Sequence, residues 1–234
     1  MNVKNKFNND EDLDYHFDPI PVYDALRTRR SVRTYQDKLI PHDNIEEMLR
    51  MSTHAPSACN RRGWRFILIE DKNRLLWLYK KGSAAFINNI NQAILVCYYR
   101  HTDNLEWNDV DQSAAAAIAY FQLIAHINGI GSCWICHLPP RKEVKKYFKI
   151  PKQYNPIALI SIGYYKKNMT TKSRDVFNEE ILSLNEWDFL PTAEKEFAGL
   201  KMLLRRFARW LYYIFPKREL LRNIVKDYEK KFDD

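Results

Sequence analysis

The chain has 234 residues, of which 46% are hydrophobic, and this is enough apolar material for the core of one large domain. Its net charge of +8 favours anionic partners such as phosphate groups, nucleic acid or an acidic membrane face. The first residues, "MNVKNKFNNDEDLDYHF", lack the apolar segment of a secretory signal, so we expect a cytoplasmic protein.

The predicted elements include two helices near the start of the chain and three core strands. Pro21 at a first helical turn, followed by apolar residues at helical spacing, predicts a short helix over 21–29. A second helix is predicted over 42–55, with Asp43 as its N-cap and Glu46 three residues later. Runs of β-branched and aromatic residues predict core strands over 64–71, 92–100 and 156–165.

A long helix is predicted over 110–128, between the last two strands, with Gly129 as its stop signal. Its apolar run is well short of the roughly 20 residues of a membrane span and indicates a buried core helix. A loop through Pro139 and Pro140 and a short helix over 141–148 follow. Helices and strands are mixed without a regular order, which predicts an α+β fold rather than a doubly wound sheet.

Four cysteines occur, and Cys133 and Cys136 form a C-x-x-C pair. His137 alone does not complete a zinc site, and no thioredoxin-like strand is predicted before the pair. We therefore predict no metal site, and reduced thiols packed as small apolar groups, for Cys59 and Cys97 as well.

The stretch "TRRSVRTY" places three arginines around one serine. In an extended segment Arg29, Ser31 and Arg33 point to one side, whereas in a helix Ser31 would face away from both arginines. The extended conformation would make a phosphate cradle, since two guanidinium groups can fork onto phosphate oxygens while the hydroxyl donates a third bond. A solvated basic turn is the alternative that this stretch alone leaves open.

Two further stretches carry polar groups into loops. "APSACNRRGWRF", residues 55–66, can present backbone amides and the Asn60 side chain to a flat heterocycle. "TKSRDVF" places Lys172 and Arg174 just beyond the last predicted strand, at the same two-residue spacing as Arg29 and Ser31.

In this order, these stretches resemble the nitroreductase family of FMN-dependent oxidoreductases over residues 21–176, together with "NGIGSCWI" and "ISIGYY". The resemblance implies a mixed sheet flanked by helices, a long central helix at a homodimer interface, and domains 1–20 (polar segment), 21–185 (FMN-binding) and 186–234 (helical extension). It implies that the basic loop and the late basic pair hold the FMN phosphate. The implied cofactor-binding residues are Arg29, Arg30, Ser31, Arg33, Pro56, Ser57, Ala58, Asn60, Trp134, Ile135, Cys136, Lys172 and Arg174.

The resemblance also implies how the site is assembled and used. Ser57, Ala58 and Asn60 would approach the flavin from the partner subunit, and Trp134 to His137 would form the loop over the isoalloxazine. The implied reaction is ping-pong hydride transfer from NADH or NADPH through flavin N5 to a small oxidised acceptor. The flavin does the chemistry, so no residue is assigned as catalytic.

Arg62 and Gly63 depart from the family, because many members carry Gln-Pro before the tryptophan. Arg62 would lie in the substrate pocket, where it could favour an anionic substrate or stabilise an anionic reduced flavin, or it could point to solvent. A flavin-binding or membrane-peripheral protein without turnover is therefore the alternative function. Nucleic-acid binding is not expected, since the basic residues are dispersed and no known module is present.

The C-terminal extension reads as a basic amphipathic helix, "AEKEFAGLKMLLRRFARWLYYIF", followed by a second charged helix after Pro216. Leu200, Leu203 and Phe207 belong to its apolar stripe, with arginines on the other side. Such a helix can make weak contact with an anionic membrane surface, or it can bury the stripe against the partner subunit. We favour packing on protein, because stripes of this kind usually face protein.

Overall fold

The computed structural model describes residues 20–102, 104, 106–165, 182–187, 203 and 207. Contacts between residues divide the chain into two compact units, Met1–Met169 and Thr170–Asp234. The elements described below all belong to the first unit. In the second unit Leu203 and Phe207 are helical and their side chains are exposed. Within the described residues, no helix is long and apolar enough to cross a membrane.

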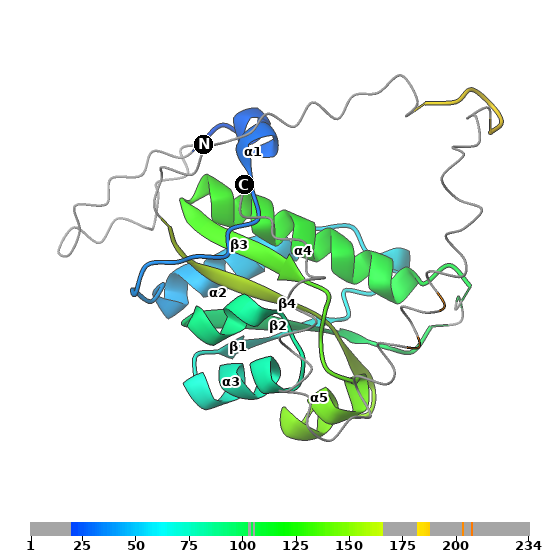
Figure 1. Cartoon of the computed structure of the whole chain (residues 1–234). Coiled ribbons are helices and arrows are strands. Elements are labelled where there is room, and N and C mark those ends of the chain that lie inside the picture. The colour runs from blue at the N-terminus through cyan, green and yellow to red at the C-terminus, as the bar shows by residue number, and fades with distance from the viewer. Residues whose placement is uncertain are drawn as a thin grey trace. The chain divides into compact units, whose positions relative to one another are not determined.

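The centre of the first unit is a four-stranded antiparallel sheet (Figure 1). The strand order is β1 (Trp64–Ile69), β2 (Gln92–Tyr99), β4 (Tyr154–Tyr164) and β3 (Ile130–Ile135). The two central strands, β2 and β4, are covered on both faces, and this explains why their sequences are nearly continuous apolar runs.

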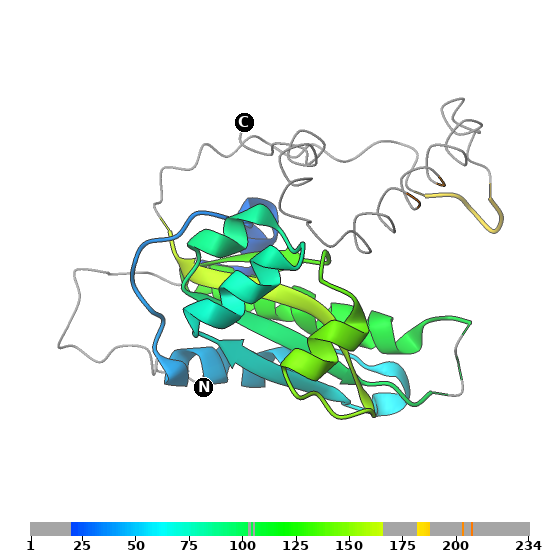
Figure 2. The same ribbon diagram turned by 60° about the horizontal axis from the view of Figure 1, so that its bottom comes forward.

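Helices cover both faces of the sheet (Figures 1 and 2). On one face α2 (His42–Ser52) and α4 (Asp109–Ile127) bury residues such as Met48 and Phe121 against β2 and β4. On the other face α3 (Lys72–Lys80) and α5 (Arg141–Tyr147) bury Leu78 and Val144, together with a 3-10 turn over Ala85–Asn89. A short helix, α1 (Val22–Thr28), contacts α4.

The α+β class is confirmed, and the three predicted strands and four helices all form. The helix expected over 42–55 ends at Ser52 and has Pro41 rather than Asp43 at its N-cap, so Asp43 lies in the first turn, where its negative charge complements the helix dipole. Strand β3 is a correction, since residues 130–135 were expected to lie in a loop. Gly131 and Ser132 have low β propensity, and antiparallel pairing with β4 stabilises the strand in spite of it. Helix α3 was also not predicted.

Candidate flavin-binding site

The basic loop is extended, as the phosphate-cradle interpretation requires. Arg29 ends α1 with an extended backbone, and Ser31 forms a parallel bridge with Ser132 on the edge strand β3. The amide of Val32 donates to the carbonyl of Ser132 at 3.0 Å, and the Val32 side chain is buried beneath the loop. The loop therefore lies against β3 as a short additional strand, with alternate side chains on opposite sides.

The bridge from Ser31 to Ser132 brings the basic loop next to Cys133 in β3. Burial raises the pKa of the Cys133 thiol, while the positive charges of Arg33 and Arg29 and hydrogen bonding with Ser31 oppose that rise. Nη1 of Arg33 also donates to the carbonyl of Ser31 at 3.3 Å. Arg29, Ser31 and Arg33 are all half-buried, and the arrangement of two guanidinium groups around the serine hydroxyl stays a prediction.

The loop is anchored from below by Tyr35. Its hydroxyl lies 2.6 Å from the Val32 carbonyl oxygen and 2.7 Å from Oγ of Ser161 on β4. Burial raises the pKa of Tyr35 far above its usual range, so the phenol stays protonated and available as a donor. These two contacts fix the basic loop to the sheet.

A histidine borders the same charged group. Nε2 of His126, in the last turn of α4, lies 2.9 Å from Oγ1 of Thr28 at the end of α1. Burial lowers the pKa of His126, and the positive charges of Arg29 and Arg30 lower it further. Arg30 also donates to the carbonyls of Arg27 and Arg29, at 2.9 and 3.1 Å. The positive charge of the loop therefore acts on His126 at the end of α4.

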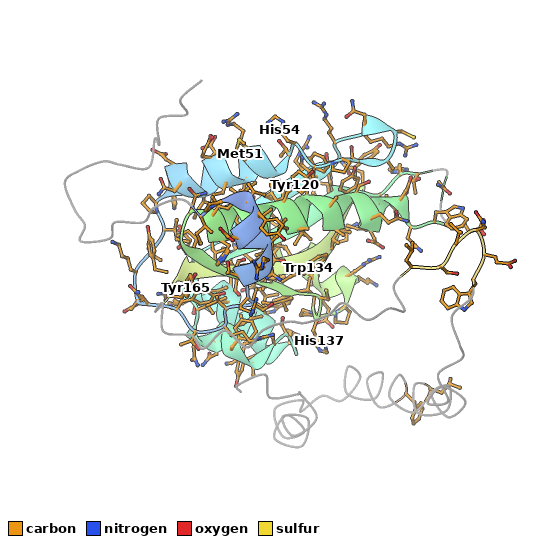
Figure 3. All side chains as sticks on the ribbon, turned by 90° about the horizontal axis from the view of Figure 1, so that it is seen from above. Met51, His54, Tyr120, Trp134, His137 and Tyr165 are labelled. Atoms are coloured by element: carbon orange, nitrogen blue, oxygen red, sulfur yellow. The ribbon has the colours of Figure 1, made fainter. Side chains whose placement is uncertain are left out.

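The residues expected to pass over the flavin ring lie partly in a strand. Trp134 and Ile135 pair with β4 as members of β3, and only Cys136 and His137 follow the strand as loop. Figure 3 shows Trp134 and His137 on this part of the molecule. Nε1 of Trp134 is buried and has no hydrogen-bond partner in the described part of the chain. The expected loop is thus shorter than the sequence indicated.

The second predicted segment, Pro56 to Arg62, is a tight loop between α2 and β1. Ala58 donates its amide to Oγ of Ser113 on α4 at 2.9 Å, and Oγ of Ser57 accepts the amide of Arg62 at 3.2 Å. Nε of Arg62 donates to Oδ1 of Asn60 at 2.9 Å. The backbones of Asn60, Arg62 and Cys59 are left-handed, a conformation that costs non-glycine residues energy and is enriched at functional sites.

Within one chain these two groups of residues are far apart. The basic loop joins edge strand β3 at Ser132, which lies in register with Ile162 and Gln92. The other loop precedes Trp64 on the opposite edge strand, in register with Tyr98. Three strand spacings of about 4.8 Å and six residues of about 3.3 Å separate the two positions, a distance of about 25 Å.

Comparison with known proteins places the fold and the basic loop in a family. The family model described as Nitroreductase family matches residues 26–95 and 75–164. The chain belongs to the nitroreductase family. A protein of Methanothermobacter thermautotrophicus, provisionally named NADH dehydrogenase/NAD(P)H nitroreductase, is 30% identical over 75% of this chain and 92% of its own length. One of Archaeoglobus fulgidus with the same name is 31% identical over 69% and 96%.

A solved structure extends the likeness to three dimensions. The structure named FMN-dependent nitroreductase from Clostridium difficile R20291 is 29% identical and covers 70% of this chain and 98% of its own, with a TM-score of 0.60. The segments matched by the nitroreductase family model run from α1 to the end of β4. They therefore include the basic loop, β3 and the loop before β1.

The structure adds residues that the nitroreductase resemblance did not indicate. His126 on α4, Ser161 on β4 and Tyr35 in the segment after the basic loop support that loop. Cys97 and Cys133 are buried as predicted, but Cys59 and Cys136 are exposed, because both lie in loops that carry no core position. Lys172 and Arg174 lie outside the described residues. Among the described residues no cluster of three metal-ligating side chains occurs.

Proposed function

We propose that this member of the nitroreductase family is an FMN-dependent oxidoreductase that passes hydride from NADH or NADPH to a small oxidised acceptor in a ping-pong reaction. The observation that supports it is the extended basic loop, in which Ser31 is bridged to Ser132 on edge strand β3 and lies between the half-buried Arg29 and Arg33. Two guanidinium forks and a hydroxyl donor are suited to a terminal phosphate group, which carries up to two negative charges.

The residues of the basic loop fit FMN by their chemistry. Arg29 and Arg33 would hold the phosphate, and Ser31 would donate to it, while the backbone bond from Val32 to Ser132 keeps the loop in place. FMN, when bound, would supply the hydride-accepting and hydride-donating chemistry. The loop after Ile135 would then lie over the ring and limit access of water.

We further propose a homodimer in which each site takes the basic loop from one chain and the Ser57–Asn60 segment from the other. The separation of about 25 Å across the sheet is longer than a flavin mononucleotide, so one chain cannot present both segments to the same molecule. Exposed apolar side chains gather on α1, α2 and α4, a face that a second copy would cover. These side chains are Val22, Tyr23, Leu26, Met51 and Tyr120. Figure 3 shows Met51 and Tyr120 on this side.

The test is reduction of the bound flavin by nicotinamide. Purified protein should be yellow, and NADH or NADPH should bleach it under anaerobic conditions, after which an added nitroaromatic or quinone should restore the colour. Dithionite serves as the control that the flavin itself can be reduced. Bleaching by dithionite but by neither nicotinamide would favour a flavin-binding protein without turnover, and a colourless protein that takes up no added FMN would exclude both.

A further inference from the structure

A pocket of about 160 Å³ lies behind the loop that leads into β1. Its walls come from that loop, from the ends of β1 and β2, from the first turn of α4 and from Tyr154 on β4. Ser113 ties the walls together, because its Oγ accepts the amide of Ala58 and donates to the carbonyl of Asp109 at 2.7 Å. Hydrogen bonds within the fold therefore hold the walls of the pocket together.

Two of the residues that line this pocket each carry a buried polar atom without a hydrogen-bond partner among the described residues. The hydroxyl of Tyr98 and Oδ1 of Asp109 have no hydrogen bond in the described part of the chain, although both residues are more than nine-tenths buried. Oδ2 of Asp109 accepts from Oγ1 of Thr102 at 2.7 Å, so only one carboxylate oxygen lacks a donor. Buried polar atoms are nearly always hydrogen-bonded, and each exception calls for a ligand or another explanation.

The rim of the pocket is strongly basic. Arg61, Arg62, Arg65 and His101 all line it, and Asp109 is the one acidic side chain among its lining residues. Arg62 uses Nε for Asn60, which leaves the two amino groups of its guanidinium as donors. The N-terminus of α4, a helix of 19 residues, adds the positive end of its dipole.

The shape of the pocket depends on a glycine. A Cβ atom at Gly63 would lie 2.8 Å from Cε1 of Tyr98 and 3.0 Å from Cβ of Tyr99, which is too close for either contact. Only glycine lets the loop approach β2 while Tyr98 keeps its ring beneath it. Arg62 therefore places a cation at the rim of the pocket, and Gly63 leaves room for the ring of Tyr98.

We propose that this pocket binds an oxyanion that still carries a proton, the class represented by hydrogen phosphate and by phosphate monoesters. The arginines would take the anionic oxygens, the Tyr98 hydroxyl would donate to another, and the P–OH group would donate to Oδ1 of Asp109. A fully deprotonated oxyanion such as sulfate offers no donor to that carboxylate and meets its repulsion instead. The proposal does not require flavin to be bound and goes beyond the oxidoreductase function.

The experiment compares phosphate with sulfate. The purified protein, with its flavin content measured, is titrated calorimetrically with sodium phosphate or sodium sulfate at equal ionic strength, at about pH 6, near the second pKa of a phosphate monoester. We expect saturable phosphate binding at one site per chain, about tenfold or more tighter than sulfate, because a hydrogen bond to a charged group distinguishes them. A parallel titration with glycerol phosphate distinguishes a phosphate monoester from inorganic phosphate as the ligand. Tighter binding of glycerol phosphate than of phosphate indicates a monoester, and weaker binding indicates inorganic phosphate.

Two variants locate the site. Asp109→Asn should remove most of the preference for phosphate over sulfate, whereas Asp111→Asn, an exposed carboxylate two residues away that faces Arg141 at 3.7 Å, should not. Arg62→Gln should weaken binding of both anions about tenfold, and Arg50→Gln, an exposed arginine on α2, should not. Unfolding of Asp109→Asn would leave the Arg62 comparison as the test.

Equal affinity for phosphate and sulfate, or absence of saturable binding in the wild-type protein, would overturn the proposal. It would also fail if binding survived Arg62→Gln unchanged. Loss of flavin in the same samples bears only on the oxidoreductase function, because the two anions are titrated against protein of known flavin content.

Discussion

Gly131 on β3 and Gly163 on β4 are register partners, and the space that they leave free holds the end of the basic loop. A Cβ atom at Gly131 would lie 3.0 Å from Cβ of Val32, and one at Gly163 would lie 2.8 Å from the ring of Tyr35. Two glycines side by side thus form a shallow channel across the sheet edge. The loop can approach β3 closely enough to form its backbone bond with Ser132 only because of this channel.

Filling the channel should therefore displace the loop. We expect Gly131→Ala to lower the free energy of unfolding by about 1–3 kcal/mol, the usual cost of overpacking, and to weaken FMN retention. Gly131→Val should be worse, since its side chain is larger. The measurements are the melting temperature and the flavin content after dialysis. Wild-type values for both variants would contradict the close approach of Val32.

Loss of one guanidinium should weaken cofactor binding directly. Arg33→Ala removes a charge-assisted contact worth about 1.5–3 kcal/mol, so FMN affinity should fall about 10- to 100-fold. Fluorescence titration of flavin-stripped protein measures this change. The matched control is Arg50→Ala, an exposed arginine that pairs with Glu47 at 2.6 Å on α2. Full flavin loading of dialysed Arg33→Ala protein would count against the phosphate cradle.

A shared site can be tested by complementation. Chains with Arg33→Ala and chains with Asn60→Ala should each bind FMN weakly. If they are unfolded and refolded together, the mixed dimers should regain one intact site, so about a quarter of all sites should recover. Homodimers refolded separately serve as the control. No recovery in verified mixed dimers, or a monomer that binds FMN, would contradict the proposed dimer.

The lowered pKa of His126 should make stability depend on pH. Because the folded state holds its proton less tightly than the unfolded state, the unfolded chain binds more protons as pH falls below the ordinary histidine pKa of about 6.5. The stabilising effect of neutral His126 is therefore complete above that pH and is lost as pH falls toward the folded-state pKa. His126→Gln should flatten this part of the profile of melting temperature against pH. An identical slope in both proteins would show that His126 does not contribute.

Truncation tests the C-terminal extension, most of which lies outside the described residues. If the apolar stripe that includes Leu203 and Phe207 packs on protein, deletion after Trp187 should lower the melting temperature, and the intact protein should not bind vesicles. Binding to anionic but not neutral vesicles, fading with added salt, together with an unchanged melting temperature, would favour the membrane surface instead.

Local sequence pattern was sufficient to predict several parts of this protein. The alternation of Arg29, Ser31 and Arg33 correctly predicted an extended loop rather than a helix at these residues. The apolar runs at 92–100 and 156–165 correctly predicted buried strands, and the long periodic segment predicted α4. The position of the C-x-x-C pair partly within a strand was missed, since Cys133 belongs to β3.

Tertiary structure decided the rest, because those features depend on residues distant in sequence. Strand β3 contains Gly131 and Ser132 and is held by pairing with β4, which no local propensity reports. The order of the strands places the basic loop and the Asn60 loop on opposite edges, and the proposal of a two-chain site rests on this topology rather than on either motif. The pocket is lined by Tyr98 from β2 and by Asp109 from α4, two residues that come to one site only when helix and sheet pack together.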